Sequence, residues 1–382
     1  MCSISIPAPC GLVCAFLRPY KLAWAITGLF PVGLYAQEVT HPDAIRSNGD
    51  PNVVQQQSTA AESTAEFVPE RGEAQPDDEV AATRLLSASD WLHRLTDSTR
   101  KLNFQISFVV SRSGQETEPY LWRHAIWEDG TAMEQLNLQN GPGRELIRVD
   151  DVVSVFEPDV PPYSLRSTEI NGPIPSELLF HPDTLKKGYE FVTVGRARVT
   201  GRPAQQIRIV SRDNTRFSYQ LWLDEKTGML LKMNTLDLQG NLLEQIQVTS
   251  LSILDSPHHY FARVNQASLP DVMAIVPKLP RQHNWEVEYL PEGMTEVKRD
   301  IRRLSLTGQV VEYKLFSDGL VDVSVYVQPA TDAVGADLVL RHDLNTFLTL
   351  TDGKAQVTVV GEIPLKTANA IATSLRVKDT GQ

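Results

Sequence analysis

Apolar and polar residues alternate along two distant stretches of this chain. A period of two places successive side chains on opposite faces of an extended segment, so each stretch is predicted to be a β-strand with one buried face. Each strand therefore needs apolar cover on that face. The apolar members are Phe104, Ile106, Phe108 and Val110 in the first stretch, and Phe217, Tyr219, Leu221 and Leu223 in the second.

Further strands are predicted around these two stretches, because short apolar runs are separated by turn residues such as Gly141-Pro142-Gly143. Helical spacing precedes them, from about 81 to 102. Ser87–Asp90 fits a capping box at the start of a helix, or lies within that helix. The strands predicted for this half are 103–111, 119–127, 132–139, 145–149, 152–157, 163–168, 189–199, 203–211, 215–224, 229–237 and 242–253.

One helix is too narrow to cover so many strands. Roughly ten strands at about 4.8 Å spacing form a sheet about 50 Å across, whereas a helix covers about 10 Å. A curved antiparallel half-barrel, plugged by the helix, would bury the rest of the apolar face. It would also leave a groove suited to acyl chains. The side chains predicted to line this groove are Phe104, Ile106, Phe108, Phe217, Tyr219, Leu221 and Leu223.

The first 36 residues are predicted to be a secretory signal peptide. Arg18 and Lys21 precede an apolar run that ends at Ala36 and is shorter than a membrane span. An N-terminal membrane anchor is the alternative. All three cysteines lie within residues 1–14. The processed chain would therefore have no thiol for catalysis, disulfides or metal binding, which suits an oxidising periplasm.

Residues 37–80 are predicted to be disordered and dispensable for folding. Ten acidic residues outnumber Arg46 and Arg71 there, and aromatic side chains are almost absent. Such a composition buries too little apolar surface to offset the entropy of ordering. Without the two basic residues of the signal peptide, the formal charge moves from −11 to −13. This acidic balance, with no block of Lys or Arg, argues against nucleic acid as a partner.

Periodicity fades between Asp255 and Gln282, where prolines recur. Residues 256–282 are therefore predicted to be a linker that lets a first domain, 81–255, move relative to a second, 283–382. The second is predicted to be a small α+β domain that ends in a helix from Pro364 to about Leu375. Its predicted strands are 284–290, 295–303, 309–317, 320–328 and 355–361.

The sequence contains no convincing catalytic constellation. Three fragments imitate serine β-lactamase motifs: Ser98-Thr99-Arg100-Lys101, Ser317-Asp318-Gly319 and Lys226-Thr227-Gly228. Their order along the chain is wrong, Ser317-Asp318-Gly319 lacks the Asn of its motif, and Lys226-Thr227-Gly228 lies in a predicted hairpin turn. His258-His259 lacks a third ligand at a recognisable spacing, so no metal site is predicted. The chain is predicted to be a binding protein without cofactor or catalytic residues.

Arginines and aromatic residues of the second domain are candidates for contact with a protein partner, because arginine makes bidentate contacts with carboxylates and phosphates. A solvated strand face and a packed core would explain the same residues. A group of arginines in the first domain has these two interpretations as well: Arg196, Arg198, Arg208, Arg212 and Arg216. The partner-binding candidates are Arg299, Arg302, Arg303, Tyr313 and Phe316.

Several stretches resemble the RseB/MucB family. They include NWEVEYLPEGM (284–294), VEYKLFSDGLVDVSVYVQPA (311–330), VTVVGEIPLKTANAIATSL (357–375) and, in the amino half, the run of strands at 188–248. The resemblance extends from about 81 to 376 in order and without large gaps. It is specific, because neither SDGL nor GEIP is a generic loop pattern.

This resemblance implies a periplasmic negative regulator of an envelope-stress sigma factor of the sigma-E or AlgU type, the latter linked to alginate. Family members bind the periplasmic segment of a membrane anti-sigma factor, RseA or MucA, and shield it from a site-one protease. Lipopolysaccharide or mislocalised lipoprotein is thought to release them. The resemblance also implies an amino domain similar to the lipoprotein carriers LolA and LolB, anti-sigma binding largely on the carboxyl domain, and compatibility with a homo-oligomer. A periplasmic lipid or lipoprotein carrier is the alternative.

Overall fold

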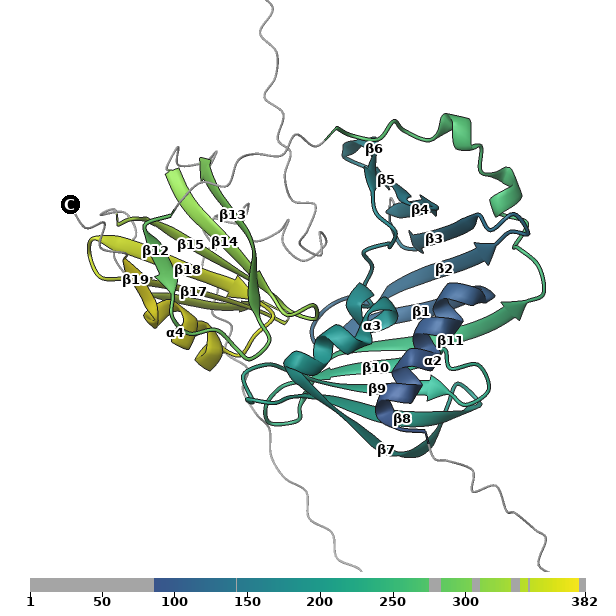
Figure 1. Ribbon diagram of the computed structural model, residues 1–382, viewed down its shortest axis with the longest axis horizontal. Helices are drawn as coiled ribbons and strands as arrows, with labels where there is room; N and C mark the ends of the chain where they lie inside the picture. The colour runs from purple at the N-terminus through teal and green to yellow at the C-terminus, as the bar shows by residue number, and fades with distance from the viewer. Residues whose placement is uncertain are drawn as a thin grey trace, which may run out of the picture. The chain divides into compact units, whose positions relative to one another are not determined.

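The computed structural model describes residues 86–274, 283–303, 310–330, 337–342 and 344–377, apart from residue 142. Residues from Leu86 onwards belong to one compact unit. The predicted signal peptide and the acidic segment 37–80 lie outside the described residues, as does the last part of the predicted linker. Antiparallel β-sheet dominates the described chain (Figure 1). None of the described helices is long and apolar enough to cross a membrane.

Helix α2 (Ala88–Lys101) begins at the capping box. The Ser87 side chain accepts a hydrogen bond from the Asp90 backbone N–H, and the Asp90 carboxylate accepts one from the Ser87 backbone N–H. This cap satisfies N–H groups that a helix start otherwise leaves unpaired. The helix therefore starts at Ala88 rather than near residue 81.

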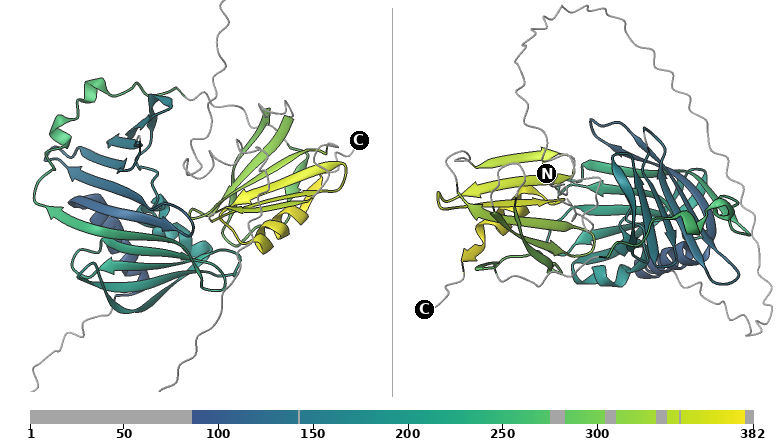
Figure 2. Two further views of the ribbon diagram at one scale, coloured as in Figure 1. Left: turned by 180° about the vertical axis from the view of Figure 1, so that it is seen from behind. Right: turned by 90° about the horizontal axis from the view of Figure 1, so that it is seen from above.

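Eleven strands form one large antiparallel sheet in the order β6-β5-β4-β3-β2-β1-β11-β10-β9-β8-β7. β6 and β7 are its outermost strands and do not pair with each other, so the sheet is not closed into a barrel. It curves, and α2 lies across one face (Figures 1 and 2). The strands are β1 (Asn103–Arg112), β2 (Glu118–Ile126), β3 (Ala132–Leu138), β4 (Glu145–Val149), β5 (Val152–Glu157), β6 (Val160–Arg166), β7 (Tyr189–Val199), β8 (Arg202–Ser211), β9 (Ser218–Asp224), β10 (Leu230–Leu236) and β11 (Leu242–Leu254).

Helix α2 is held at the β9–β10 turn. Arg94 Nη2 donates to the Lys226 carbonyl at 2.7 Å, and the Ser98 hydroxyl donates to the Thr227 carbonyl. Gly228 has a φ of +79°, and a Cβ there would lie 2.7 Å from Arg94 Cγ. Glycine therefore suits this turn on both conformational and steric grounds.

A small second sheet follows, in the order β13-β14-β15-β18-β17-β16, beside a β12–β19 pair. α4 (Leu365–Thr373) packs against β17 and β18. The open sheet with its plugging helix, and the small second α+β part, confirm the predicted fold class. The remaining strands are β12 (Trp285–Val287), β13 (Thr295–Arg303), β14 (Val310–Ser317), β15 (Asp322–Pro329), β16 (Leu338–His342), β17 (Asn345–Thr351), β18 (Ala355–Gly361) and β19 (Leu375–Val377).

The chain after β11 docks on the large sheet instead of hanging free. Phe261 is 2% exposed and packs with Ala125 and Met133, on the face opposite α2 by strand alternation. Tyr260 Oη donates to Glu145 Oε1 at 2.9 Å. The first part of the predicted linker is therefore anchored, although regular apolar periodicity is absent there.

Candidate functional site

All seven side chains predicted to line a lipid groove are buried in the large sheet, each with a relative exposure of 4% or less. They lie on β1 and on or just before β9, which β11 and β10 connect within the sheet. All except Phe217 belong to one apolar cluster with Trp91 and Leu92 of α2. These side chains form packed core beneath the helix. Their role in lipid binding stays a prediction.

A segment between β6 and β7 covers another part of the same face. This covering segment, Ser167–Lys187, includes the short helices α3 (Ser176–Phe180) and η1 (Pro182–Lys187). Gly172 passes so close to β3 that a Cβ there would lie 2.7 Å from Leu136 Cδ2. The covering segment therefore closes this region of the sheet. Its side chains in the main core cluster are Ile170, Ile174, Leu178, Leu179 and Leu185, and the partly buried Phe180 packs against them.

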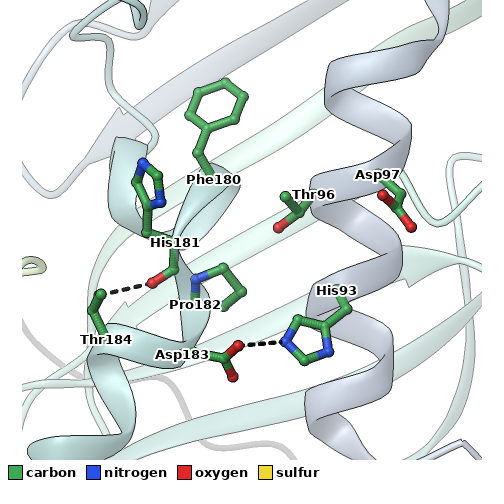
Figure 3. A pocket seen from close by; sticks show the side chains of 8 residues that line it. All are labelled: His93, Thr96, Asp97, Phe180, His181, Pro182, Asp183 and Thr184. Carbon is green, nitrogen blue, oxygen red and sulfur yellow. Dashed lines mark hydrogen bonds and ion pairs between the residues drawn. The ribbon is translucent and has the colours of Figure 1, made fainter.

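A cavity of about 370 Å³ lies between α2 and the covering segment (Figure 3). Polar groups line much of it. His93 Nε2 of α2 lies 2.9 Å from Asp183 Oδ2, and His181 Nε2 lies 2.8 Å from Glu169 Oε1. Nowhere in the described ranges do His, Cys, Asp and Glu side chains group to hold a metal ion. The cavity is thus a polar seam rather than the predicted apolar groove.

The ion pair between Glu134 and Arg148 is buried within the helix-covered face. Glu134 on β3 accepts hydrogen bonds from Trp122 Nε1 at 2.7 Å and from Arg148 Nε at 2.9 Å. The strand register places Glu134 between Arg148 and His124. Burial lowers the pKa of His124, and its ring stacks on Phe104 with centroids 5.4 Å apart. This part of the core is therefore polar but internally paired.

A second buried cluster joins the large sheet to the small one. Arg216 lies in the β8–β9 connection and has no exposed side-chain surface. Its guanidinium donates to Asp318 and to Asp213 Oδ1, the latter at 3.1 Å, and lies 4.7 Å from the Tyr189 ring. Tyr189 Oη donates to Asp318 Oδ2 at 3.0 Å. We call Arg216, Asp318, Asp213 and Tyr189 the Arg216 junction.

The junction corrects the interpretation of Arg216 as a solvated or docking arginine. Its charge is neutralised inside the protein by an ion pair with Asp318, which follows β14 within the SDGL sequence (317–320). Burial, and then the Asp318 carboxylate, raise the pKa of Tyr189 well above its ordinary value. The tyrosine hydroxyl therefore stays protonated and donates to Asp318.

Acid is expected to weaken the junction through Asp213. Burial alone would raise the pKa of Asp213, but hydrogen bonds from Ser211, Thr215 and the Glu292 N–H, together with Arg216, hold it well below its usual range. A carboxyl whose pKa is depressed by folding stabilises the protein above its unfolded pKa of about 4, and this contribution is lost as pH falls.

Urea unfolding at a series of pH values should therefore show a stability loss between about pH 5 and pH 2. Asp213→Asn is expected to flatten part of that loss. The exposed Asp159→Asn serves as a control and should follow the wild type. A pH profile for Asp213→Asn that parallels the wild type would contradict this role of Asp213.

The predicted partner-binding residues do not form one surface cluster. Tyr313 and Phe316 are 1% and 3% exposed and belong to the interior of the small sheet. Arg299 is partly exposed and pairs with Glu296 on its own strand. The side chains of Arg302 and Arg303 lie outside the described residues. Contact of these residues with a partner stays a prediction.

Residue patterns alone did not reveal the Arg216 junction. Arg216 precedes an alternating strand and resembles any other polar residue at a strand end. SDGL was noted only as a distinctive loop. The available signal had two parts. One was a charged residue, Arg216, beside an apolar strand, and the other was the acidic turn at Asp318, more than a hundred positions away. Pairing those two segments required knowledge of the fold.

Comparison with known proteins covers nearly all of the described chain. Residues 87–273 match the MucB/RseB N-terminal domain, and residues 280–376 match the MucB/RseB C-terminal domain. The chain is 32% identical over 287 residues to the "Sigma-E factor regulatory protein RseB" of Escherichia coli K12, covering 75% of this chain and 89% of that protein. It is 32% identical over 323 residues to the "Sigma factor AlgU regulatory protein MucB" of Pseudomonas aeruginosa, covering 79% and 95%.

Solved structures agree with these matches. The MucA/MucB complex of Pseudomonas aeruginosa aligns with a TM-score of 0.61 at 30% identity, over 77% of this chain and 99% of that one. A structure of MucB in complex with MucA(peri) aligns with a TM-score of 0.60 at 31% identity, over 77% and 100%. Both domain matches and these alignments show that the chain belongs to the MucB/RseB family.

Proposed function

We propose that this protein binds the periplasmic segment of a membrane anti-sigma factor of the RseA/MucA type and so restrains an envelope-stress sigma factor. The observation that carries the proposal is the match along both domains to proteins named as sigma-E and AlgU regulators. The alignment to a MucA/MucB complex supports the same partner. The role is binding rather than catalysis, and its place is the periplasm.

Binding would protect the anti-sigma factor from site-one proteolysis for a steric reason. A protease needs its substrate segment extended and accessible in the active-site cleft. A segment held against the folded surface of this protein is withheld from that cleft in proportion to the bound fraction. Protection therefore follows from affinity and needs no contact between this protein and the protease.

Release by lipid is supported by the balance of apolar surfaces. An acyl chain of about 14 methylenes gains roughly 11 kcal/mol on burial, at about 0.8 kcal/mol per CH₂. Displacing the covering segment exposes its aliphatic side chains, at about 1.5–3 kcal/mol each. The gain from burying one acyl chain is similar to the summed cost of exposing the aliphatic side chains of the covering segment. An acyl chain can therefore exchange with the covering segment reversibly, as a sensor of lipopolysaccharide or mislocalised lipoprotein requires.

A lipid or lipoprotein carrier is the second candidate, because the open sheet with its helix-covered apolar face would serve it equally. The carrier and the regulator differ in whether they require the small sheet, which follows the large sheet in the chain. A carrier needs only the large sheet, whereas a regulator needs a further surface for its protein partner. The match to the MucB/RseB C-terminal domain over 280–376 favours the regulator.

The test uses the chain from residue 37 and the purified periplasmic segment of the MucA/RseA-type anti-sigma factor from the same organism. Calorimetric titration is expected to show a saturable complex. Adding this protein should slow cleavage of the segment by the purified site-one protease. Lipopolysaccharide or a synthetic dipalmitoylated lipopeptide should restore cleavage. Absence of a complex would reject the regulator, and lipid binding without a complex would favour the carrier.

A further inference from the structure

In the Arg216 junction, a buried guanidinium of the large-sheet domain is neutralised by a carboxylate, Asp318, that belongs to the small sheet. Arg216 and Asp318 have side-chain exposures of 0% and 2%. Separating such a pair inside the protein leaves a buried charge without its partner, which is strongly unfavourable. The contact is therefore either fully made or lost together with the local packing of the two sheets. An element with two discrete states of this kind can carry a signal.

Further hydrogen bonds and one close backbone approach surround the junction. The Glu292 N–H donates to Asp213 Oδ2 at 2.7 Å, and Thr367 Oγ1 donates to the Thr215 carbonyl at 2.6 Å. A Cβ at Gly188 would lie 2.5 Å from the Glu292 carbonyl oxygen. The backbones thus meet at a distance that a larger residue would not allow. These contacts align the two sheets around the buried Arg216–Asp318 pair.

The covering segment runs directly into this junction. It ends just before Gly188, whose carbonyl accepts a hydrogen bond from Arg216 Nη2 at 3.2 Å. Gly319, next to Asp318, lies against α3, because a Cβ there would be 3.1 Å from Glu177 Cγ. One turn of the small sheet thus touches the covering segment and also holds Arg216. Displacement of the covering segment reaches Asp318 through direct contacts.

We infer that Arg216, Asp318 and Tyr189 are positioning residues that couple lipid entry under the covering segment to the affinity for the anti-sigma segment. The inference rests on the proposed function and specifies how it is regulated. Lipid favours the arrangement in which the covering segment has left, and the anti-sigma segment favours the arrangement with the junction made. Two ligands that prefer different arrangements weaken each other's binding by the same factor.

The experiment measures this coupling factor, the ratio of Kd values for the anti-sigma segment with and without saturating dipalmitoylated lipopeptide. The wild type is expected to give a factor within the usual range of about 5 to 150. Asp318→Asn keeps the size of the side chain but removes its charge, and should reduce the factor to about 2 or less. Tyr189→Phe, which removes one hydroxyl, should give an intermediate value. Measured alone, the anti-sigma segment should bind Asp318→Asn more weakly than the wild type, because the variant already populates the arrangement that this ligand disfavours.

Glu134→Gln is the matched control. It removes the carboxylate of an ion pair that is equally buried but lies within the large sheet, away from the junction. The variant should lose stability yet keep the wild-type coupling factor. The inference is overturned when Asp318→Asn couples as well as the wild type, or when Glu134→Gln loses coupling to the same degree. A wild type that binds the anti-sigma segment but ignores lipopeptide overturns both the release step and this inference, and leaves anti-sigma binding intact.

A second measurement tests the junction without the anti-sigma segment, and it therefore applies even when no complex with that segment forms. The chain has no cysteine after Cys14, so spin labels can be placed cleanly at Gln239→Cys and Asn369→Cys, one beside each sheet. The distance distribution between the labels should be narrow in the wild type and broad in Asp318→Asn, while Glu134→Gln stays narrow. Lipopeptide should broaden the wild-type distribution. Equal widths in the wild type and Asp318→Asn would reject the junction as the coupling element.

Discussion

Replacing Phe104 with alanine is expected to lower the free energy of unfolding by about 3–5 kcal/mol. The side chain is fully buried and packs edge-on against Trp122, with ring centroids 4.9 Å apart, as well as stacking on His124. Truncation removes these contacts and leaves a cavity that the hydrogen-bonded sheet backbone cannot collapse to fill. Urea denaturation followed by tryptophan fluorescence measures the loss.

Val109→Ala on the same strand is the control, because Val109 faces the opposite side of the sheet and is only partly buried. Its cost should stay near or below about 1 kcal/mol. The comparison separates core packing from strand propensity. A Phe104→Ala protein as stable as Val109→Ala would mean that this face is loosely packed. In that event an open groove would be the better description of the face.

Arg148→Met is expected to lower the free energy of unfolding by a similar amount, about 3–5 kcal/mol. The substitution leaves the Glu134 carboxylate 3% exposed with no cation beside it. Trp122 Nε1 still donates to the carboxylate, but one neutral donor does not replace a guanidinium. Thermal and urea unfolding at pH 7 would show the loss.

Adding Glu134→Gln to Arg148→Met should recover part of the lost free energy of unfolding, although both members of the ion pair are then replaced. The amide is neutral, so no charge is left buried, and its Oε1 still accepts from Trp122 Nε1. Replacing both members of a buried pair is commonly less costly than removing one. A double variant less stable than Arg148→Met would show that the charge on Glu134 is compensated by another group.

Part of the large sheet could be predicted from sequence because burial on one face leaves a period of two in strands such as β1. β1, β4 and β5 were predicted within one residue of their observed ends. β16 was missed for the corresponding reason. All five of its residues are exposed, so burial imposed no pattern on Leu338–His342. β17 lies between β16 and β18 and was missed with it.

The buried polar residues were harder to predict than the apolar ones. Tyr313 and Phe316 could be read either as core or as partner anchors, and the structure places both in the interior. Arg216 was interpreted with four other arginines of the first domain as part of a solvated or docking face, because arginine is mostly exposed. Its partner Asp318 is 102 positions away. Local patterns carry no information about a pairing across such a separation, whereas the fold creates it.

The pairing of β1 with β11 also determines how the large sheet can assemble. Asn103 lies opposite Leu254, so the central strand pair joins residues from the two ends of the domain sequence. Closing a loop of that size is entropically costly, and contacts between distant residues slow folding. The two halves can form hairpins early, but the central pair must wait until β11 has been delivered. Whenever the chain emerges from its amino end, the large sheet therefore stays in two unjoined halves until β11 (Leu242–Leu254) has emerged.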